Sequence, residues 1–240
     1  MKLDLIKSIK LIFIFFLIIT SKYFFSSINV KKDLSEEDIR AIKMLNVDKQ
    51  CKKISDYKSE IECIKTIQIA QKNLVNSEKC RTGLIDVEPI NFINYNFGCC
   101  YDRARFIEKT LTYYGFESRR IFLLATDKYG IFSAIVPKQD SHAVSEAKTS
   151  KGWIGVETIE PFFVLNDEDN NPLTFRKALK EKYNFPKKIY DNFYYRNPMS
   201  INGLYSRHGK FHNPYIPLPE INFKDFAYNF NILNLILVNK

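Results

Sequence analysis

The chain has 240 residues and carries 36 Lys and Arg against 27 Asp and Glu, which gives a net charge of +9. Hydrophobic residues make up 45% and charged residues 26%, so a largely disordered chain is excluded and a domain with a real core is expected. Because there is no dense Lys/Arg stripe and no nucleic-acid-binding motif, we expect no nucleic-acid partner. We interpret the excess positive charge as a basic, solvated surface, with an anionic envelope or membrane partner as the alternative.

The N-terminal segment is typical of a signal sequence. Three lysines in the first ten residues precede nine uninterrupted apolar residues, 11–19. That run is too short to span a bilayer by itself, but the twenty residues that start there carry a single charge, Lys22. No small-x-small cleavage site follows, so we expect residues 1–30 to be an uncleaved signal anchor, with a cleaved signal peptide as the alternative. Either places the rest of the chain outside the cytoplasm, at the cell surface or in the periplasm.

The cysteine count is odd. Cys51, Cys63, Cys80 and Cys99 all precede Cys100, and an exported protein can keep disulfides. Two bridges would leave Cys100 unpaired; Cys51–Cys63 with Cys80–Cys99 is one of three possible pairings. The other reading is that all five cysteines are reduced. The absence of any C-x-x-C pair argues against a zinc site or a thioredoxin-type motif.

The first predicted elements are helices. Ser35 and the three acidic residues after it predict a helix start, and the helix continues to about residue 46. Apolar residues at steps of three and four predict a longer helix over 56–74. Residues 81–98 contain proline and glycine and are expected to be irregular.

The helix that begins at Cys100 is the most informative element. Apolar residues recur from Cys100 at helical steps as far as Tyr114, so Cys100 is the first residue of the buried face, and Gly115 ends the helix. Four strands are predicted after it, over 118–125, 131–136, 141–147 and 153–159. Helices followed by a run of strands predict an α+β fold with an antiparallel sheet.

The chain becomes polar and proline-rich after residue 165. We expect a short helix over 174–182, an irregular lid or wrap over 183–222 and an apolar closing element over 223–238. No flexible linker divides the chain, so residues 31–240 are predicted to form a single domain with a core over about 90–165 and a C-terminal wrap over 166–240.

Cys100 is the candidate nucleophile. At a helix N-terminus the helix dipole and the unpaired N–H groups stabilise a thiolate. Cys100 is preferred to Cys99 because it lies on the buried stripe. For the sheet to serve this thiol, we expect the face that carries His142 to pack on the helix stripe that begins with Cys100.

His142 and Glu157 lie on consecutive predicted strands. If the hairpin turns at residues 149–150, the two face each other directly; a turn one residue later makes them diagonal neighbours within side-chain reach. A carboxylate beside an imidazole fixes its tautomer and stabilises the imidazolium. Glu160 and Asp140 are the alternative acids.

Three blocks of residues resemble the transglutaminase-like superfamily of cysteine enzymes, over about residues 90–160. The superfamily pattern Gly-x-Cys-x-Asp/Glu-x-Ala is matched by residues 98–104, and its closing Gly-Phe lies 15 residues after Cys100. The pattern His-Ala-x-x-Glu is matched by residues 142–146. A pattern similar to Gly-Trp-x-x-Val-Asp-x-Thr is present at residues 152–158, with Glu157 where the family usually has Asp.

The resemblance implies a papain/transglutaminase-like core in which the Cys-bearing helix packs on an antiparallel sheet. It also implies a peptidase or acyl transferase that acts on an amide or ester bond through Cys100, His142 and Glu157 without a cofactor, and the N-terminal segment predicts that this enzyme is tethered to the membrane. The substrate is expected to be a protein, a peptide or an envelope component. The backbone N–H of Cys100 is the natural oxyanion donor, and Asn94 is a candidate second donor. The alternative function is a catalytically inactive envelope binding module or scaffold with the same fold.

His208 and His212 invite a metal interpretation that the surrounding sequence does not favour. Gly209 and the nearby prolines argue against a helix that presents both imidazoles, and no carboxylate or cysteine lies close in sequence. No metal site is therefore expected. A loop that flanks the cleft and contacts substrate through Arg207 or His208 is the preferred reading.

Overall fold

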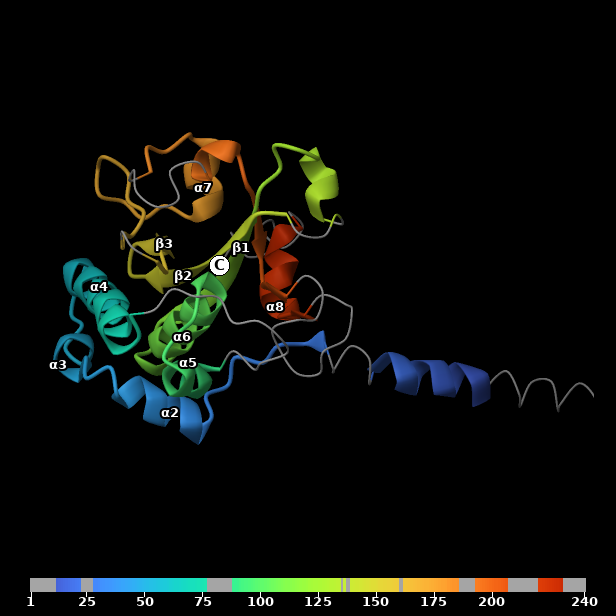
Figure 1. Cartoon of the computed structure of the whole chain (residues 1–240), viewed down its shortest axis with the longest axis horizontal. Coiled ribbons are helices and arrows are strands. Elements are labelled where there is room, and N and C mark those ends of the chain that lie inside the picture. Colours follow the sequence, from blue (N-terminus) through green and yellow to red (C-terminus); the bar gives the residue numbers. More distant parts are fainter. Residues whose placement is uncertain are drawn as a thin grey trace, which may run out of the picture.

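The computed structural model describes residues 12–22, 28–76, 88–134, 136, 139–159, 162–185, 193–206 and 220–230. Helices come first, an antiparallel sheet follows, and shorter elements then cover the sheet (Figure 1), which confirms the α+β class. The helices are α2 (Glu36–Lys43), α3 (Asp48–Cys51), α4 (Tyr57–Leu74), α5 (Pro89–Tyr95), α6 (Cys100–Tyr113), α7 (Phe175–Lys180) and α8 (Phe223–Phe226). The strands are β1 (Glu117–Leu124), β2 (Ser141–Thr149), β3 (Gly152–Val156), β4 (Met199–Asn202), β5 (Leu204–Ser206) and β6 (Glu220–Ile221), and the 3₁₀ turns are η1 (Gly130–Ala134), η2 (Tyr194–Arg196) and η3 (Ala227–Asn229).

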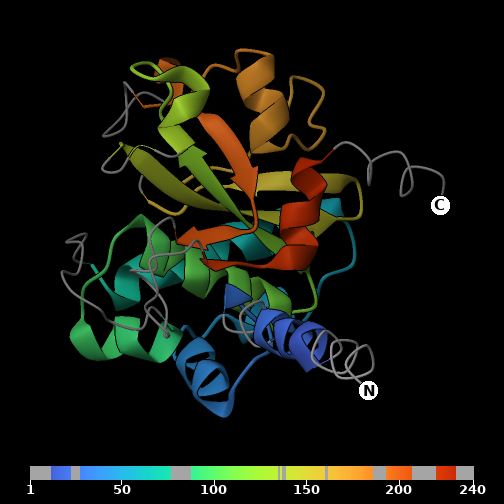
Figure 2. The same ribbon diagram turned by 90° about the vertical axis from the view of Figure 1, so that its right-hand side faces the viewer.

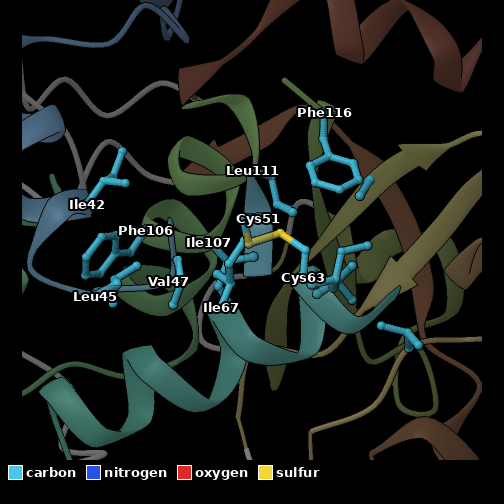
Figure 3. Close-up of a cluster of buried hydrophobic side chains, with 14 of the residues drawn as sticks. Ile42, Leu45, Val47, Cys51, Cys63, Ile67, Phe106, Ile107, Leu111 and Phe116 are labelled. Carbon is cyan, nitrogen blue, oxygen red and sulfur yellow. A yellow bond between two sulfur atoms is a disulfide. The ribbon is translucent and has the colours of Figure 1, made fainter. Parts of the chain in front are cut away.

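The helical layer begins as the sequence predicts. Ser35 and Asp38 form a capping box at the start of α2, with the Asp38 N–H donating to Ser35 Oγ at 3.1 Å. A disulfide joins Cys51 at the end of α3 to Cys63 in α4, which confirms that part of the possible pairing. Figure 3 shows this bond among the apolar side chains of the helical cluster. A cross-link that closes a loop of this size contributes about 3 kcal/mol to folding.

Helix α6 lies against β1 and β2, and its chain reverses at Gly115. The φ of Gly115 is +90°, a left-handed conformation that favours glycine at the end of a helix. The Ser145 hydroxyl donates to the Ala104 carbonyl at 3.1 Å and so fixes the height of α6 on β2. Figure 2 shows the sheet between these helices and α7.

The main sheet is antiparallel with strand order β3-β2-β1-β4. Thr149 pairs with Gly152, so the β2–β3 hairpin turns at residues 150–151, one residue later than the first expected register. His142 and Glu157 are therefore diagonal neighbours rather than direct partners. Strand β3 also ends earlier than predicted, at Val156, so Glu157 lies just beyond it.

The two faces of the sheet have different neighbours. Ala147, Ile154 and Val156 belong to the helical cluster, whereas Leu123 and Val144 pack with Phe175 and other residues of the C-terminal half. Because side chains alternate along a strand, His142 shares the face of Val144, on the side away from α6.

The expectation that the His142-bearing face packs on the Cys100 stripe is therefore wrong. Ser145, which is one residue out of phase with Val144, contacts the helix instead. His142 is the second residue of β2, so it lies at the end of the sheet, where a side chain can reach the N-terminus of α6.

Several segments differ from their predicted conformation. Part of the segment expected to be irregular forms α5, with Pro89 in the first turn, where its missing N–H costs nothing. The strand predicted over 131–136 is the turn η1 in its described part, since a short apolar run alone does not distinguish strand from helix. The wrap predicted over 183–222 contains β4, β5 and β6, and β4 extends the main sheet.

Both edges of the main sheet are covered. On β4, the Asn202 N–H donates to Asn229 Oδ1 at 2.9 Å, and Asn229 Nδ2 donates back to the Asn202 carbonyl at 2.9 Å. On β3, the Gly155 N–H donates to the Leu173 carbonyl at 2.8 Å. The amide side chain of Asn229 thus takes the place of a neighbouring strand.

Residues 12–22 form a helix whose apolar side chains are exposed. Within the described ranges, no helix combines the length and the apolar character that crossing a membrane requires. Residues 1–11 and 23–27 of the predicted signal segment lie outside the described residues. In the C-terminal half, so do residues 186–192, 207–219 and 231–240.

Gly155→Ala is expected to destabilise the protein by about 1–3 kcal/mol, the usual cost of overpacking a core. A Cβ at this position would lie 2.5 Å from Leu165 Cδ1 and 2.9 Å from the Phe175 ring. Chemical denaturation measures the change. Lys148→Ala, at an exposed position on β2, is the control and should alter stability by less than about 0.5 kcal/mol. Equal effects of the two substitutions would contradict the close packing at Gly155.

Candidate active site

Cys100 is the first residue of α6; the residue is half-buried and its thiol is free. Cys99, the N-cap, is disulfide-bonded, and its N–H donates to Asp102 Oδ2 at 3.1 Å. The Cys99 bond to Cys80 considered above involves a residue outside the described ranges. Gly98 lets the chain approach Phe92, since a Cβ there would lie 2.6 Å from that ring. These features fix the thiol at the positive end of the helix dipole.

His142 and Glu157 are in direct contact. His142 Nε2 lies 2.8 Å from Glu157 Oε1, and the two residues are only 1% and 2% exposed. His142 and Cys100 also interact electrostatically. The three residues singled out from the sequence are thus brought together.

The Glu157 carboxylate is held by several donors. Its Oε1 accepts from the backbone N–H groups of Thr158 at 2.7 Å and Ile159 at 3.0 Å, and its Oε2 accepts from the Tyr194 hydroxyl. Of the alternative acids, Asp140 pairs with Arg196 at 2.6 Å, and Glu160 lies outside the described residues.

The three side chains shift one another's pKa values. Burial raises the pKa of the Cys100 thiol, but the hydrogen bond and charge of His142 outweigh it, so the pKa lies below its ordinary value. Burial lowers the pKa of His142, but Glu157 and Cys100 raise it to about 10. Burial raises the pKa of Glu157, yet His142 and Tyr194 hold it below the ordinary range. At neutral pH these directions favour a thiolate, an imidazolium and a carboxylate.

Arg120 is a buried cation that no sequence motif indicated. It pairs with Ser145 across β1 and β2, so it lies on the face that packs on α6, and it is 1% exposed. Its guanidinium carbon lies 5.2 Å from the centroid of the Tyr205 ring, and in the described part of the chain its Nε and Nη1 have no hydrogen-bond partner. Against burial, and together with His142, its charge lowers the pKa of the Cys100 thiol.

Glu146, the last residue of the His-Ala-x-x-Glu block, has a structural contact set. Its Oε2 accepts from Arg119 Nε at 2.7 Å, and its Oε1 accepts from the Phe175 N–H at 2.8 Å. Arg119 also lies over the Trp153 ring, at 4.1 Å from its centroid. The block therefore ties β1, β2, β3 and the start of α7 together beside the site.

Asn94, the candidate second oxyanion donor, is an exposed residue of α5. The backbone N–H of Cys100, at the first turn of α6, keeps its position as an oxyanion donor because first-turn N–H groups have no partner within the helix. In the described part of the chain, no group of three or more His, Cys, Asp and Glu side chains could hold a metal ion. His208, His212 and Arg207 lie outside that part.

Tyr194 and Arg120 are the site residues that sequence reasoning missed. Tyr194 lies 37 residues from Glu157 in a segment rich in aromatic residues, and nothing in its spacing distinguishes it from its neighbours. Arg120 is the last of four polar residues that begin β1, so nothing in the strand distinguished it from Arg119.

Comparisons with protein-family models, with curated proteins and with solved structures found no match for this chain.

Cys100 is expected to react with iodoacetamide at a pH well below the ordinary thiol pKa of about 8.5. Because the Cys100 pKa is lowered, the labelling rate should fall only when the pH drops through that lower value. In His142→Ala the midpoint should move upward, since burial then raises the thiol pKa with less opposition. The measurement is the labelling rate of the Cys100 peptide by mass spectrometry over a pH series. Identical profiles for the wild type and His142→Ala would contradict the pairing.

Proposed function

We propose that this chain is a thiol enzyme of the transglutaminase-like class that acts on an amide or ester bond through Cys100, His142 and Glu157. The observation that carries the proposal is the position of His142 between two groups. It interacts with the free thiol at the N-terminus of α6, and its Nε2 lies 2.8 Å from Oε1 of the buried Glu157. Such a chain supplies a nucleophile, a proton carrier and a group that orients the carrier.

The reaction follows from these roles. The Cys100 thiolate attacks the carbonyl carbon, a C–S bond forms, and the N–H of Cys100 donates to the oxygen that becomes negative. His142 gives its proton to the leaving amine or alcohol as the C–N or C–O bond breaks, which leaves a thioester on Cys100. Water or a second amine then attacks the thioester carbonyl, His142 accepts its proton, the C–S bond breaks, and Cys100 leaves as the thiolate. Glu157 stabilises the imidazolium in both steps.

The finer fold assignment, a papain/transglutaminase-like core, is part of the proposal. It is supported by the chain order of the elements, with a cysteine at the head of α6, then the histidine on β2 and the acid after β3. The longer Glu157 side chain is compatible with this geometry because the diagonal register leaves room for the extra methylene.

We place the enzyme outside the cytoplasm, tethered by its N-terminal segment, with a protein, peptide or envelope component as substrate. The exposed apolar helix over 12–22 and the Cys51–Cys63 disulfide support this placement, because disulfides persist in oxidising compartments.

An electrophilic acyl probe should label Cys100 in the intact protein. His142→Ala should lower the labelling rate roughly 100-fold, the lower range for losing a general base, and Cys100→Ala should abolish labelling. His212→Ala is the matched control, since it makes the same change at one of the other two histidines of the chain. Labelling that is insensitive to His142→Ala would favour the non-catalytic binding module.

The full chain, expressed in a bacterium, should remain in the membrane fraction after a carbonate wash. Its intact mass should include residues 1–30, because we expect the signal segment to stay uncleaved. Protease added to spheroplasts should digest the domain, which the N-terminal lysines orient outward. A shortened protein that is released from the membrane would indicate a cleaved signal peptide in place of the anchor. Digestion of the domain only after cell lysis would refute export.

A further inference from the structure

The two carboxylate oxygens of Glu157 accept hydrogen bonds from different parts of the chain, and the two sets of bonds restrict the carboxylate in different ways. The backbone N–H groups of Thr158 and Ile159 and the imidazole of His142 all converge on Oε1. Oε2 accepts from the Tyr194 hydroxyl, which comes from a segment distant in sequence. A carboxylate with one oxygen fixed can still pivot about that oxygen when several side-chain torsions change together, so the contact to Oε2 sets the plane of the group.

Tyr194 is itself rigidly placed. Its ring stacks on Phe185 with centroids 4.3 Å apart and an interplanar angle of 8°, and it stacks on Phe175 at 6.3 Å. Its ring is also edge-on to His142, at 6.2 Å, and Phe193 meets the same imidazole at 6.0 Å. Tyrosine has few rotatable bonds, so these contacts fix the direction of its hydroxyl at little further entropic cost.

Tyr194 lies in a short segment, residues 193–197, that we call the strap, and the strap is bound to residues on both sides of the β1–β2 connection. Arg196 pairs with Asp127 at 3.0 Å and with Asp140 at 2.6 Å, on the two sides of the connection between β1 and β2. The Thr126 hydroxyl donates to the Asn197 carbonyl at 2.8 Å. The strap therefore cannot move away from the site without breaking these contacts.

We propose that Tyr194 is a positioning residue that holds Glu157 ionised and in plane, so that the shared proton stays on His142 and the thiolate of Cys100 keeps its cationic partner. The proposal rests on the proposed function. It also explains how Glu157 can orient the imidazole at a position where the transglutaminase-like family usually has aspartate. The glutamate side chain has one more torsion than aspartate, and the hydrogen bond from Tyr194 restricts it.

In the part of the chain that the structure describes, these side chains contact Glu157. His142 lies on β2, Tyr194 on the strap, and Gln68 of α4, which is uncharged, donates to the Glu157 backbone carbonyl at 2.7 Å. Without the tyrosine donor the carboxylate becomes a stronger base in a dry site, and it competes with the imidazole for the proton. If the proton moved from His142 to Glu157, a neutral imidazole would be left beside Cys100, and the thiolate would lose its cationic partner.

The test is the pH dependence of iodoacetamide labelling at Cys100 in the full chain. Tyr194→Phe keeps both ring stacks and removes the hydroxyl. It should slow labelling at pH 7 roughly tenfold, the scale of one hydrogen bond to a charged group, and move the acid midpoint to higher pH. Tyr183→Phe is the matched control, because it removes a hydroxyl in the same aromatic cluster without touching Glu157. It should label like the wild type.

A double substitution separates positioning from general support of the fold. In a Glu157→Gln background, Tyr194→Phe should cause no further change in the labelling profile, because its effect passes through the carboxylate. Phe185→Leu is a second variant that keeps the hydroxyl but removes its stacking partner, and it should shift the midpoint in the same direction by less. Thermal unfolding of each variant shows how much folded protein is being measured.

The outcomes distinguish the two proposals. If His142→Ala moves the wild-type midpoint upward but Tyr194→Phe does not, Tyr194 is a structural residue only and the positioning role is overturned. A lower melting temperature with an unchanged midpoint leads to the same conclusion. If the wild type itself labels like an ordinary thiol, the proposed function fails as well.

Discussion

The packing of α6 on β1 and β2 is the constraint on which the rest of the structure depends. The tight reversal at Gly115 joins α6 to β1, so these two elements run antiparallel. The hydrogen bond from Ser145 of β2 to the Ala104 carbonyl fixes the position of α6 along the sheet. These two features place Cys100, the first residue of α6, at the end of the sheet. The helices α2 to α5 and the C-terminal elements then cover the two sides of this unit, and neither side has to provide the nucleophile.

Buried charges hold the helical side in register with the C-terminal elements. Arg105 of α6 lies between Glu88 and Glu108, at 3.0 and 3.1 Å, and Lys109 pairs with Asp38 of α2 at 2.6 Å. The Tyr205 hydroxyl of β5 donates to Glu108, so the network crosses from helix to strand. Buried pairs of this kind add little net stability, but removing one partner is costly, which makes wrong packings of these helices unfavourable.

Local chemistry made much of the fold predictable. The Ser35 cap, the helical stripe after Cys100 and the two-residue periodicity of β2 depend on neighbours in sequence, and each of these elements forms close to where it was expected. The contact between His142 and Glu157 was predictable too, because both hairpin registers considered left the pair within reach.

What could not be predicted depends on partners distant in sequence. Which face of the sheet meets α6 is decided by the twist of the whole sheet and by what the C-terminal half brings to the other side. The hydroxyl of Tyr194 and the guanidinium of Arg120 are placed by tertiary packing, so one sequence shows only an aromatic run and a polar first half of a strand. At Asn94 a helix formed where a loop was expected, and the residue is exposed.

The cover that Asn229 provides on β4 has a consequence for solubility. An uncovered edge strand offers N–H and C=O groups to any other extended chain, including a second copy of the same protein. Here one amide side chain occupies both groups of Asn202, and Arg176 donates to the Ser200 carbonyl at 3.2 Å. Because these groups are already paired, this part of β4 is a poorer template for the addition of a strand from a second copy of the chain.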